Sequence, residues 1–248
     1  MDTPGYVILS RLGAQLRATE VLAHNLANAD TPGFRASRPI FAAAVERQRD
    51  VAAQGPAGRM VAYAQDRATW RDDTQGPVSV TGNPFDIAIR GEGFFVVETP
   101  GGAERYTRAG RFLLDQDRRL VDADGNAVLD ARGTPITLAA GDTRIEVKGD
   151  GSLRSENGEI GRLRIVRFED PQRSLRAEGA RLFAADEPAQ PVERPTLVQG
   201  AVEGSNVSAI EELTRLTGEL REFQFAAQFA EREGERLQTA VERILRRR

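Results

Sequence analysis

Residues 208–245 carry apolar positions spaced alternately three and four apart, which is the a/d pattern of a coiled-coil seam. Ser208 followed by Glu211 has the form of a capping box that starts a helix. At about 1.5 Å per residue, this helix would be roughly 57 Å long. A helix of that length needs partners to cover its seam. The seam positions are Leu213, Leu216, Leu220, Phe223, Ala227, Ala230, Gly234, Leu237, Val241 and Ile244.

A pair of phenylalanines adds a second apolar feature to the same segment. Phe225 and Phe229 are four residues apart, so they share one helix face, which lies nearly opposite the seam. One interpretation is two scattered exposed aromatics, since single apolar residues are common on surfaces. The other is a helix contacted on both sides inside a multi-helix assembly. We take both phenylalanines, with the seam, as candidate interface residues.

The N-terminus carries a shorter stripe of the same kind. Thr3 and Pro4 fit an N-cap and first helical residue, and we expect the helix to run to about Ala29. Its stripe consists of Leu9, Leu12, Leu16, Thr19, Ala23 and Leu26. The two terminal helices are natural partners, but the C-terminal one is longer by about 18 Å. Neighbouring copies or other proteins must therefore cover the excess seam, which predicts polymerisation.

The middle of the chain has an irregular part followed by a part with the apolar period of β-strands. Residues 36–80 look irregular, with a short helix expected at 42–50 and breakers at 54–58. From Phe85 the apolar period switches to two, and short apolar runs alternate with turns such as Asp124-Gly125. We expect an all-β body of about 115 residues. The fold class is therefore mixed with segregated α and β parts: a coiled-coil-like domain of the terminal helices, interrupted by an inserted all-β domain.

Composition excludes several classes of function. The chain has 248 residues, of which 40% are hydrophobic and 29% charged, and its net charge of −3 leaves no electrostatic footprint for nucleic acid. It has no cysteine, and no apolar run approaches the roughly 18 residues of a membrane span. The N-terminus lacks the pattern of a signal peptide. We expect no small-molecule substrate, no cofactor and no direct membrane insertion.

Candidate catalytic and metal sites fail on inspection. Gly91-Glu92-Gly93 lacks the third glycine and the helix of a nucleotide loop, and a tight turn explains it. The Asp122-x-Asp124-Gly125 stretch would place Leu120 and Ala131 where a calcium loop needs acids. His24 is the only histidine, so His/Cys metal sites are excluded. We predict no enzyme activity and no metal.

Four stretches of the chain carry distinctive motifs. Residues 27–35 read Ala-Asn-Ala-Asp-Thr-Pro-Gly-Phe-Arg, in which Thr31-Pro32-Gly33-Phe34 fits a type II turn and Asn28 precedes it. The others are residues 81–97, 106–112 and 200–213. In order and spacing, these stretches resemble the motifs of the axial proteins of the bacterial flagellum, and of its basal-body rod proteins in particular. Residues 81–97 and 106–112 resemble the central block of that family, and residues 200–213 resemble the stretch that opens its C-terminal helix. Asp30 and Phe34 stand where Asn and Tyr are common.

The resemblance implies more than the composition does. Residues 1–35 and 201–248 would be the helices of an inner, D0-like domain, residues 36–80 the linker, and residues 81–200 a D1-like outer domain. The length and the short 36–80 segment are most similar to a proximal rod protein, with a distal rod protein as the alternative. The resemblance implies export by the flagellar type III apparatus without a cleaved signal peptide. It also implies assembly with other copies and other rod proteins into a hollow drive shaft in the periplasm.

Two other classes of function remain to be compared with the rod interpretation. A β-domain adhesin or binding module trimerised by a coiled coil would need one continuous stalk, whereas here the helices bracket the β body. An enzyme would need catalytic side chains in a recognisable arrangement, and the sequence does not offer one. The candidate sites are therefore the assembly interface and the motif turn at Asn28, Thr31, Pro32, Gly33 and Phe34.

Overall fold

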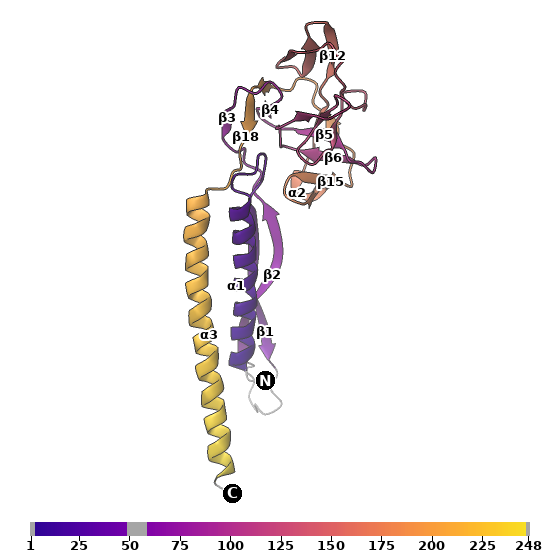
Figure 1. Cartoon of the computed structure of the whole chain (residues 1–248). Coiled ribbons are helices and arrows are strands. Elements are labelled where there is room, and N and C mark those ends of the chain that lie inside the picture. Colours follow the sequence, from indigo (N-terminus) through magenta and orange to yellow (C-terminus); the bar gives the residue numbers. More distant parts are fainter. Residues whose placement is uncertain (1–2, 49–58, 247–248) are drawn as a thin grey trace. The chain divides into compact units, whose positions relative to one another are not determined.

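The computed structural model describes residues 3–48 and 59–246. Helices lie at both ends of the chain and a β-rich region lies between them, as the sequence predicts (Figure 1). The chain divides into two compact units. The helical unit contains residues 1–26, 37–70 and 209–248, and the β unit contains residues 27–36 and 71–208. No helix in the described part of the chain is long and apolar enough to cross a membrane.

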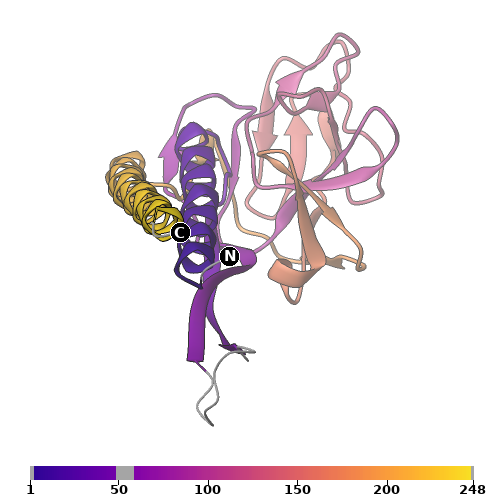
Figure 2. The same cartoon turned by 90° about the horizontal axis from the view of Figure 1, so that it is seen from below.

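The helical unit pairs the two terminal helices. Helix α1 spans Thr3–Ala27 and helix α3 spans Ala209–Leu245. The helices run antiparallel and side by side (Figures 1 and 2), because Arg11 pairs with Glu222 and Asn25 bonds to Glu212. The 37 residues of α3 against the 25 of α1 confirm that the C-terminal helix is the longer one.

Residues 36–80 are not an irregular linker, and the helix expected at 42–50 is wrong over its described part. Strands β1 (Ser37–Gln48) and β2 (Arg59–Arg71) pair as a two-stranded sheet. The alanines and charged residues of this segment favour a helix locally, but pairing with a strand farther along the chain overrides that preference. The breaker cluster at 54–58 lies outside the described residues.

The buried face of α1 differs from the predicted stripe. Leu9 and Leu16 are exposed, whereas Ala18, Val21 and Leu22 are buried. The buried positions lie about 120° around the helix from the predicted stripe, at 100° per residue. They include two polar residues, Gln15 and Asn25. A search for apolar spacing alone misses such a face, because its polar members find hydrogen-bond partners only in the tertiary structure.

The β unit is built on one large sheet. Its nine strands include the path β14-β15-β6-β5-β9-β8-β7, and β13 pairs with both β5 and β16. The strands of this sheet are β5 (Phe94–Glu98), β6 (Glu104–Thr107), β7 (Leu113–Leu114), β8 (Leu120–Val121), β9 (Ala127–Val128), β13 (Ile165–Arg167), β14 (Leu175–Glu178), β15 (Leu182–Ala185) and β16 (Gln190–Pro191). A short helix α2 (Pro171–Ser174), capped by Asp170, precedes β14.

Strand β5 has core on both faces. Phe95 and Val97 belong to one apolar cluster, with Phe112 and Leu120, whereas Phe94 and Val96 belong to the other cluster. Successive side chains of a strand point to opposite faces, so a strand buried on both sides is apolar at every position. The run Phe94 to Val97 has this composition.

Three smaller ladders complete the β unit. Strands β10 (Ile145–Val147), β11 (Ser152–Ser155) and β12 (Gly158–Arg162) form an antiparallel sheet. Strand β4 (Ile87–Ile89) pairs with β17 (Leu197–Gln199), and β3 (Val78–Val80) pairs with β18 (Ala201–Glu203). The last two ladders bring the end of the β unit beside its beginning, where the family motifs of the sequence meet.

Candidate functional site

The predicted turn after α1 has the expected geometry. Thr31 O accepts a hydrogen bond from Phe34 N at 3.2 Å, and Gly33 at the third position has φ +69°. These features define a type II turn with Pro32 at its second position. The Thr31 hydroxyl also lies 3.2 Å from Asn28 Oδ1. The five motif residues therefore form one local structure.

This turn is packed tightly into the β unit. Gly33 N donates to Glu203 O at 2.9 Å. A Cβ atom on Gly33 would lie 2.5 Å from Ala109 N and from the carbonyl carbon of Arg108. Only glycine combines the positive φ with this close approach of two backbone segments. The next residue, Phe34, is buried against Ala36 and Val207.

A buried carboxylate lies at the centre of the same region. Glu203 Oε1 lies 2.8 Å from Arg35 Nη2, and Glu203 Oε2 lies 3.2 Å from Arg108 Nε. The two arginine side chains are 4% exposed and the glutamate 1%. Gly76 N donates to Glu203 Oε1 at 3.3 Å. Buried charges persist only when they are paired, so this Arg35–Glu203–Arg108 cluster joins three distant segments of the chain.

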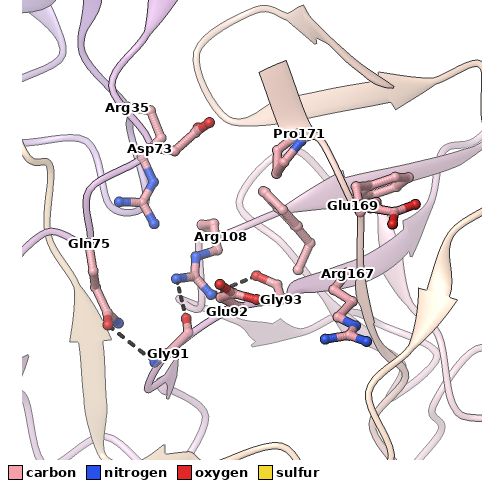
Figure 3. Close-up of a pocket in the computed structure, with 12 residues that line it drawn as sticks. Arg35, Asp73, Gln75, Gly91, Glu92, Gly93, Arg108, Arg167, Glu169 and Pro171 are labelled. Atoms are coloured by element: carbon pink, nitrogen blue, oxygen red, sulfur yellow. Dashed lines mark hydrogen bonds between the residues drawn. The ribbon is translucent and has the colours of Figure 1, made fainter. Parts of the chain in front are cut away.

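Arg108 is held on its other side by backbone carbonyls. Its Nη1 donates to Gly93 O at 2.6 Å and its Nη2 to Gly91 O at 2.7 Å, as Figure 3 shows. Burial lowers the pKa of Arg108 to about 10, and the Glu203 carboxylate opposes that shift. The Gly91-Glu92-Gly93 turn thus supplies two carbonyl acceptors for this guanidinium. This is the turn for which the sequence offered no support as a nucleotide loop.

An open pocket of about 450 Å³ adjoins this cluster. Arg35, Arg108 and Arg167 line it together with Asp73, Glu92 and Glu169, so acidic and basic groups are balanced. Arg35 Nη1 and Arg108 Nε are buried and have no hydrogen-bond partner among the described residues, although Arg108 Nε lies in the ion pair with Glu203. No group of three or more acidic or histidine residues in the described chain could hold a metal ion.

Asn206 ties a further pair of segments to the turn. Its Oδ1 accepts from Ala36 N at 2.7 Å, and its Nδ2 donates to Asp72 O at 2.8 Å and to Thr74 O at 3.1 Å. A single amide thus joins Ala36, just after the turn, to the segment that follows β2. We define the motif junction as residues 31–36, 72–76, 108–110 and 203–207.

The helical unit contains its own buried carboxylate. Glu212 is 1% exposed, and its carboxylate accepts from Arg38 Nη1 at 2.5 Å, Arg215 Nη1 at 3.0 Å and Asn25 Nδ2 at 3.3 Å. Asn25 also donates to Ser37 O at 2.8 Å and accepts from Ser37 N at 2.9 Å. These bonds fasten α1, β1 and α3 to one another.

Most of the predicted interface residues lie on the surface of the helical unit. Leu12, Leu26, Leu216 and Phe223 are half-buried, and the side chains of Val241 and Ile244 lie outside the described residues. The remaining seven candidates are exposed: Leu9, Leu16, Leu213, Leu220, Phe225, Phe229 and Leu237. The described residues of the chain leave these apolar side chains uncovered.

Sequence reasoning missed the pairing of Arg35, Arg108 and Glu203, and the roles of Asn25 and Asn206. Arg35, Arg108 and Glu203 stand in or beside the quoted motifs as single charged residues between uncharged neighbours, which was a usable signal. Their pairing was not visible, because charge alone does not show which side chains are buried together.

Family models match three parts of the chain. The description "Flagella basal body rod protein" applies to residues 6–35, "Flagellar hook protein FlgE/F/G D1 domain" to residues 88–155, and "Flagellar basal body rod FlgEFG protein C-terminal" to residues 198–243. The matched regions contain most of α1 with the motif turn, the centre of the β unit, and most of α3.

Relatives cover nearly the whole chain. The flagellar basal-body rod protein FlgF of Caulobacter vibrioides is 34% identical over 246 residues, which cover 98% of each chain. FlgF of Mesorhizobium japonicum is 34% identical over 224 residues, covering 90% of this chain and 89% of the relative. FlgG of Agrobacterium fabrum is 31% identical over 234 residues, covering 86% and 88%.

The chain belongs to the family of flagellar basal-body rod proteins. Within this family it resembles FlgF over most of its length, and FlgG is a close alternative. It is a structural rod subunit of the flagellar basal body and not an enzyme, which decides against the catalytic and adhesin interpretations. Its assembly partners are other rod proteins.

Proposed function

We propose that the terminal helices are the assembly domain of this subunit and that the β unit forms the outer layer of a hollow rod. The helical unit would form the inner domain, with bounds at residues 26 and 209 in place of the expected 35 and 201, and the β unit would form the outer domain. Copies of the chain and other rod proteins pack through coiled-coil-like contacts of α1 and α3. The resulting shaft transmits torque for motility.

The observation that carries this proposal is the uncovered apolar surface of the helical unit. Seven of the predicted interface residues are exposed, and they lie on both helices. Large apolar side chains gathered on one element mark an interaction surface more often than a solvated face. A rod subunit needs such a surface on the part of the chain that contacts its neighbours.

The helices of the free subunit are expected to be loosely ordered. Isolated helices depend on tertiary packing for most of their stability, and here that packing is incomplete. Ordering on incorporation costs conformational entropy, which opposes premature polymerisation. The subunit would pass unfolded through the flagellar type III export apparatus and reach the periplasmic part of the basal body without a cleaved signal peptide.

The similarity to FlgF favours a position in the proximal rod. The resemblance to FlgG keeps a distal rod position as the alternative. Position-specific labelling of the subunit in isolated basal bodies would distinguish the two.

Leu220→Asp tests the assembly surface. Leu220 is 43% exposed, so the substitution leaves the fold of the free chain intact while placing a charge in the seam. We expect loss of rod incorporation and of swimming, with an unchanged β-unit spectrum. Gln224→Asp, on an exposed neighbouring position of α3, is the matched control and should swim normally. Normal rods built from the Leu220→Asp protein would refute the proposal.

A further inference from the structure

The last segment of the β unit lies along segments from its beginning. Strand β17 pairs with β4 through Leu197↔Ile89, and β18 pairs with β3, beside which it lies in Figure 1. Beyond β18, Gly204 N donates to Pro77 O at 2.8 Å. Each step forward along residues 197–207 therefore meets a segment that lies earlier in the chain. We call residues 197–207 the strap.

The far end of the strap reaches the motif turn. Glu203 O accepts from Gly33 N at 2.9 Å, and Val207 packs in one apolar cluster with Phe34 and Ala36. The buried ion pairs of Glu203 lie at the same place. The turn thus takes several of its partners from the strap, which stands at the opposite end of the β unit's sequence.

The strap is part of the interior of the β unit. Leu197 belongs to the larger apolar cluster, together with Ile87 and Phe95. The other buried residues of the strap are Ala201, Val202, Glu203, Ser205 and Val207. The β unit is therefore incomplete until the strap is in place.

The large sheet can form before the strap is in place. Several of its ladders join strands that follow one another in the chain: β5 with β6, β7 with β8, β8 with β9, and β14 with β15. Its other ladders close longer loops, but its last strand, β16, ends at Pro191, before the strap begins. Contacts between residues close in sequence form early, because they cost little loop-closure entropy. We therefore expect the sheet to fold ahead of the strap.

The folded sheet brings one end of the strap close to its partner strand. Strand β13 pairs with both β5 and β16, and β5 closely follows β4 while β16 closely precedes β17. Joining β17 to β4 therefore closes only a short loop. Joining Val207 to Phe34 first would close a loop across most of the β unit, which costs more entropy. Closure is thus favoured to start at Leu197.

We propose that the strap is a closing device that zips onto the β unit last, from Leu197 to Val207. A chain that emerges N-terminus first, from a ribosome or an export channel, delivers the motif turn early and the strap late. The turn therefore lacks its partners Glu203, Asn206 and Val207 until nearly the whole β unit has emerged. Strap closure is a property of the single chain, so it goes beyond the proposed function, and neither outcome of its test bears on rod assembly.

Refolding of the full chain from urea, with pulsed hydrogen–deuterium labelling read by NMR, measures the order of closure. Unfolding is kept brief so that the prolyl bonds retain their native isomers. The reporting amides are Leu129, which donates to Val96 O in the sheet, Arg90, which donates to Thr196 O where the strap begins, and Gly33 at the strap's far end.

We expect protection first at Leu129, then at Arg90, and severalfold later at Gly33. This order follows from loop closure, because each contact brings the next one within reach. Simultaneous protection of all three amides, or protection of Gly33 ahead of Arg90, would overturn the inference.

Two variants test the direction of closure. Leu197→Ala weakens the contact at which closure starts, so it should delay protection severalfold at both Arg90 and Gly33. Asn206→Ala removes hydrogen bonds at the far end and should delay protection at Gly33 alone. Where Leu197→Ala prevents folding, Val198→Ala, at a half-buried position of the same strand, takes its place. An equal delay at both amides in Asn206→Ala would show that closure does not start at Leu197.

Discussion

Arg35 Nη2 and Glu203 Oε1 lie 2.8 Å apart in the interior of the β unit, although one follows α1 and the other precedes α3. Gly33 N donates to the Glu203 carbonyl in the same place. The chain therefore enters and leaves the β unit at adjacent points, joined by a side-chain ion pair and a backbone hydrogen bond.

Glu203→Gln should destabilise the β unit strongly. The substitution removes the carboxylate that the buried guanidinium groups of Arg35 and Arg108 share, and removing one partner of a buried pair costs about 3–5 kcal/mol. Urea unfolding of the full chain, followed by the signal of the β unit, measures the loss. Glu104→Gln breaks the more exposed pair with Arg164 and should cost less than about 1 kcal/mol. Similar losses in both variants would contradict a special role for Glu203.

Gly33→Ala should be worse than the same substitution at another glycine of positive φ. Gly33 and Gly82 have φ of +69° and +76°, so an alanine at either position would cost about 1–2 kcal/mol in backbone strain. A Cβ at Gly33 also meets two backbone atoms at 2.5 Å, whereas at Gly82 it meets nothing within 4 Å. Thermal unfolding should show a clearly larger drop in Tm for Gly33→Ala. Equal drops would mean that the turn is free to move away from Arg108.

Asn25→Ala should loosen the start of β1. The substitution removes both hydrogen bonds to Ser37 and the bond to Glu212, and unsatisfied buried groups cost about 1–3 kcal/mol. Hydrogen exchange at the Ser37 amide should accelerate, while exchange in β5 stays slow. Glu20→Ala, an exposed change on the same helix, should leave Ser37 protected. Unchanged protection in Asn25→Ala would show that other contacts hold β1.

Glu156 should titrate in an unusually acidic range. Its carboxylate accepts from the Thr143 hydroxyl at 2.6 Å, from Thr143 N at 2.8 Å and from Arg144 N at 3.0 Å, which lower its pKa to about 2. Because the folded pKa lies below the unfolded one, the stabilisation is present above the ordinary glutamate range and is lost as pH falls towards 2. Carboxyl NMR titration measures this pKa directly. Thr143→Val should raise it, and a pKa near 4.5 in the native protein would contradict these hydrogen bonds.

The sequence predicted the order of elements better than it predicted their buried faces. The long C-terminal helix, the type II turn at Thr31–Phe34 and the strands from Phe94 onward follow from local spacing and turn chemistry, and all are present. The pairing of β1 with β2 and the buried face of α1 were predicted incorrectly. Both depend on contacts between separate segments of the chain, where local preference carries little information.

By itself, the sequence determined that the chain has helical ends, a β-rich centre and the motifs of a flagellar rod protein. Heptad spacing, alternation and turn residues act over a few positions, so they can be recognised without coordinates. Only the tertiary structure decided that Arg35, Arg108 and Glu203 form one buried cluster, and that Asn25 bonds to both Ser37 and Glu212. Buried polar groups need specific partners, and which partners they find depends on how distant segments pack.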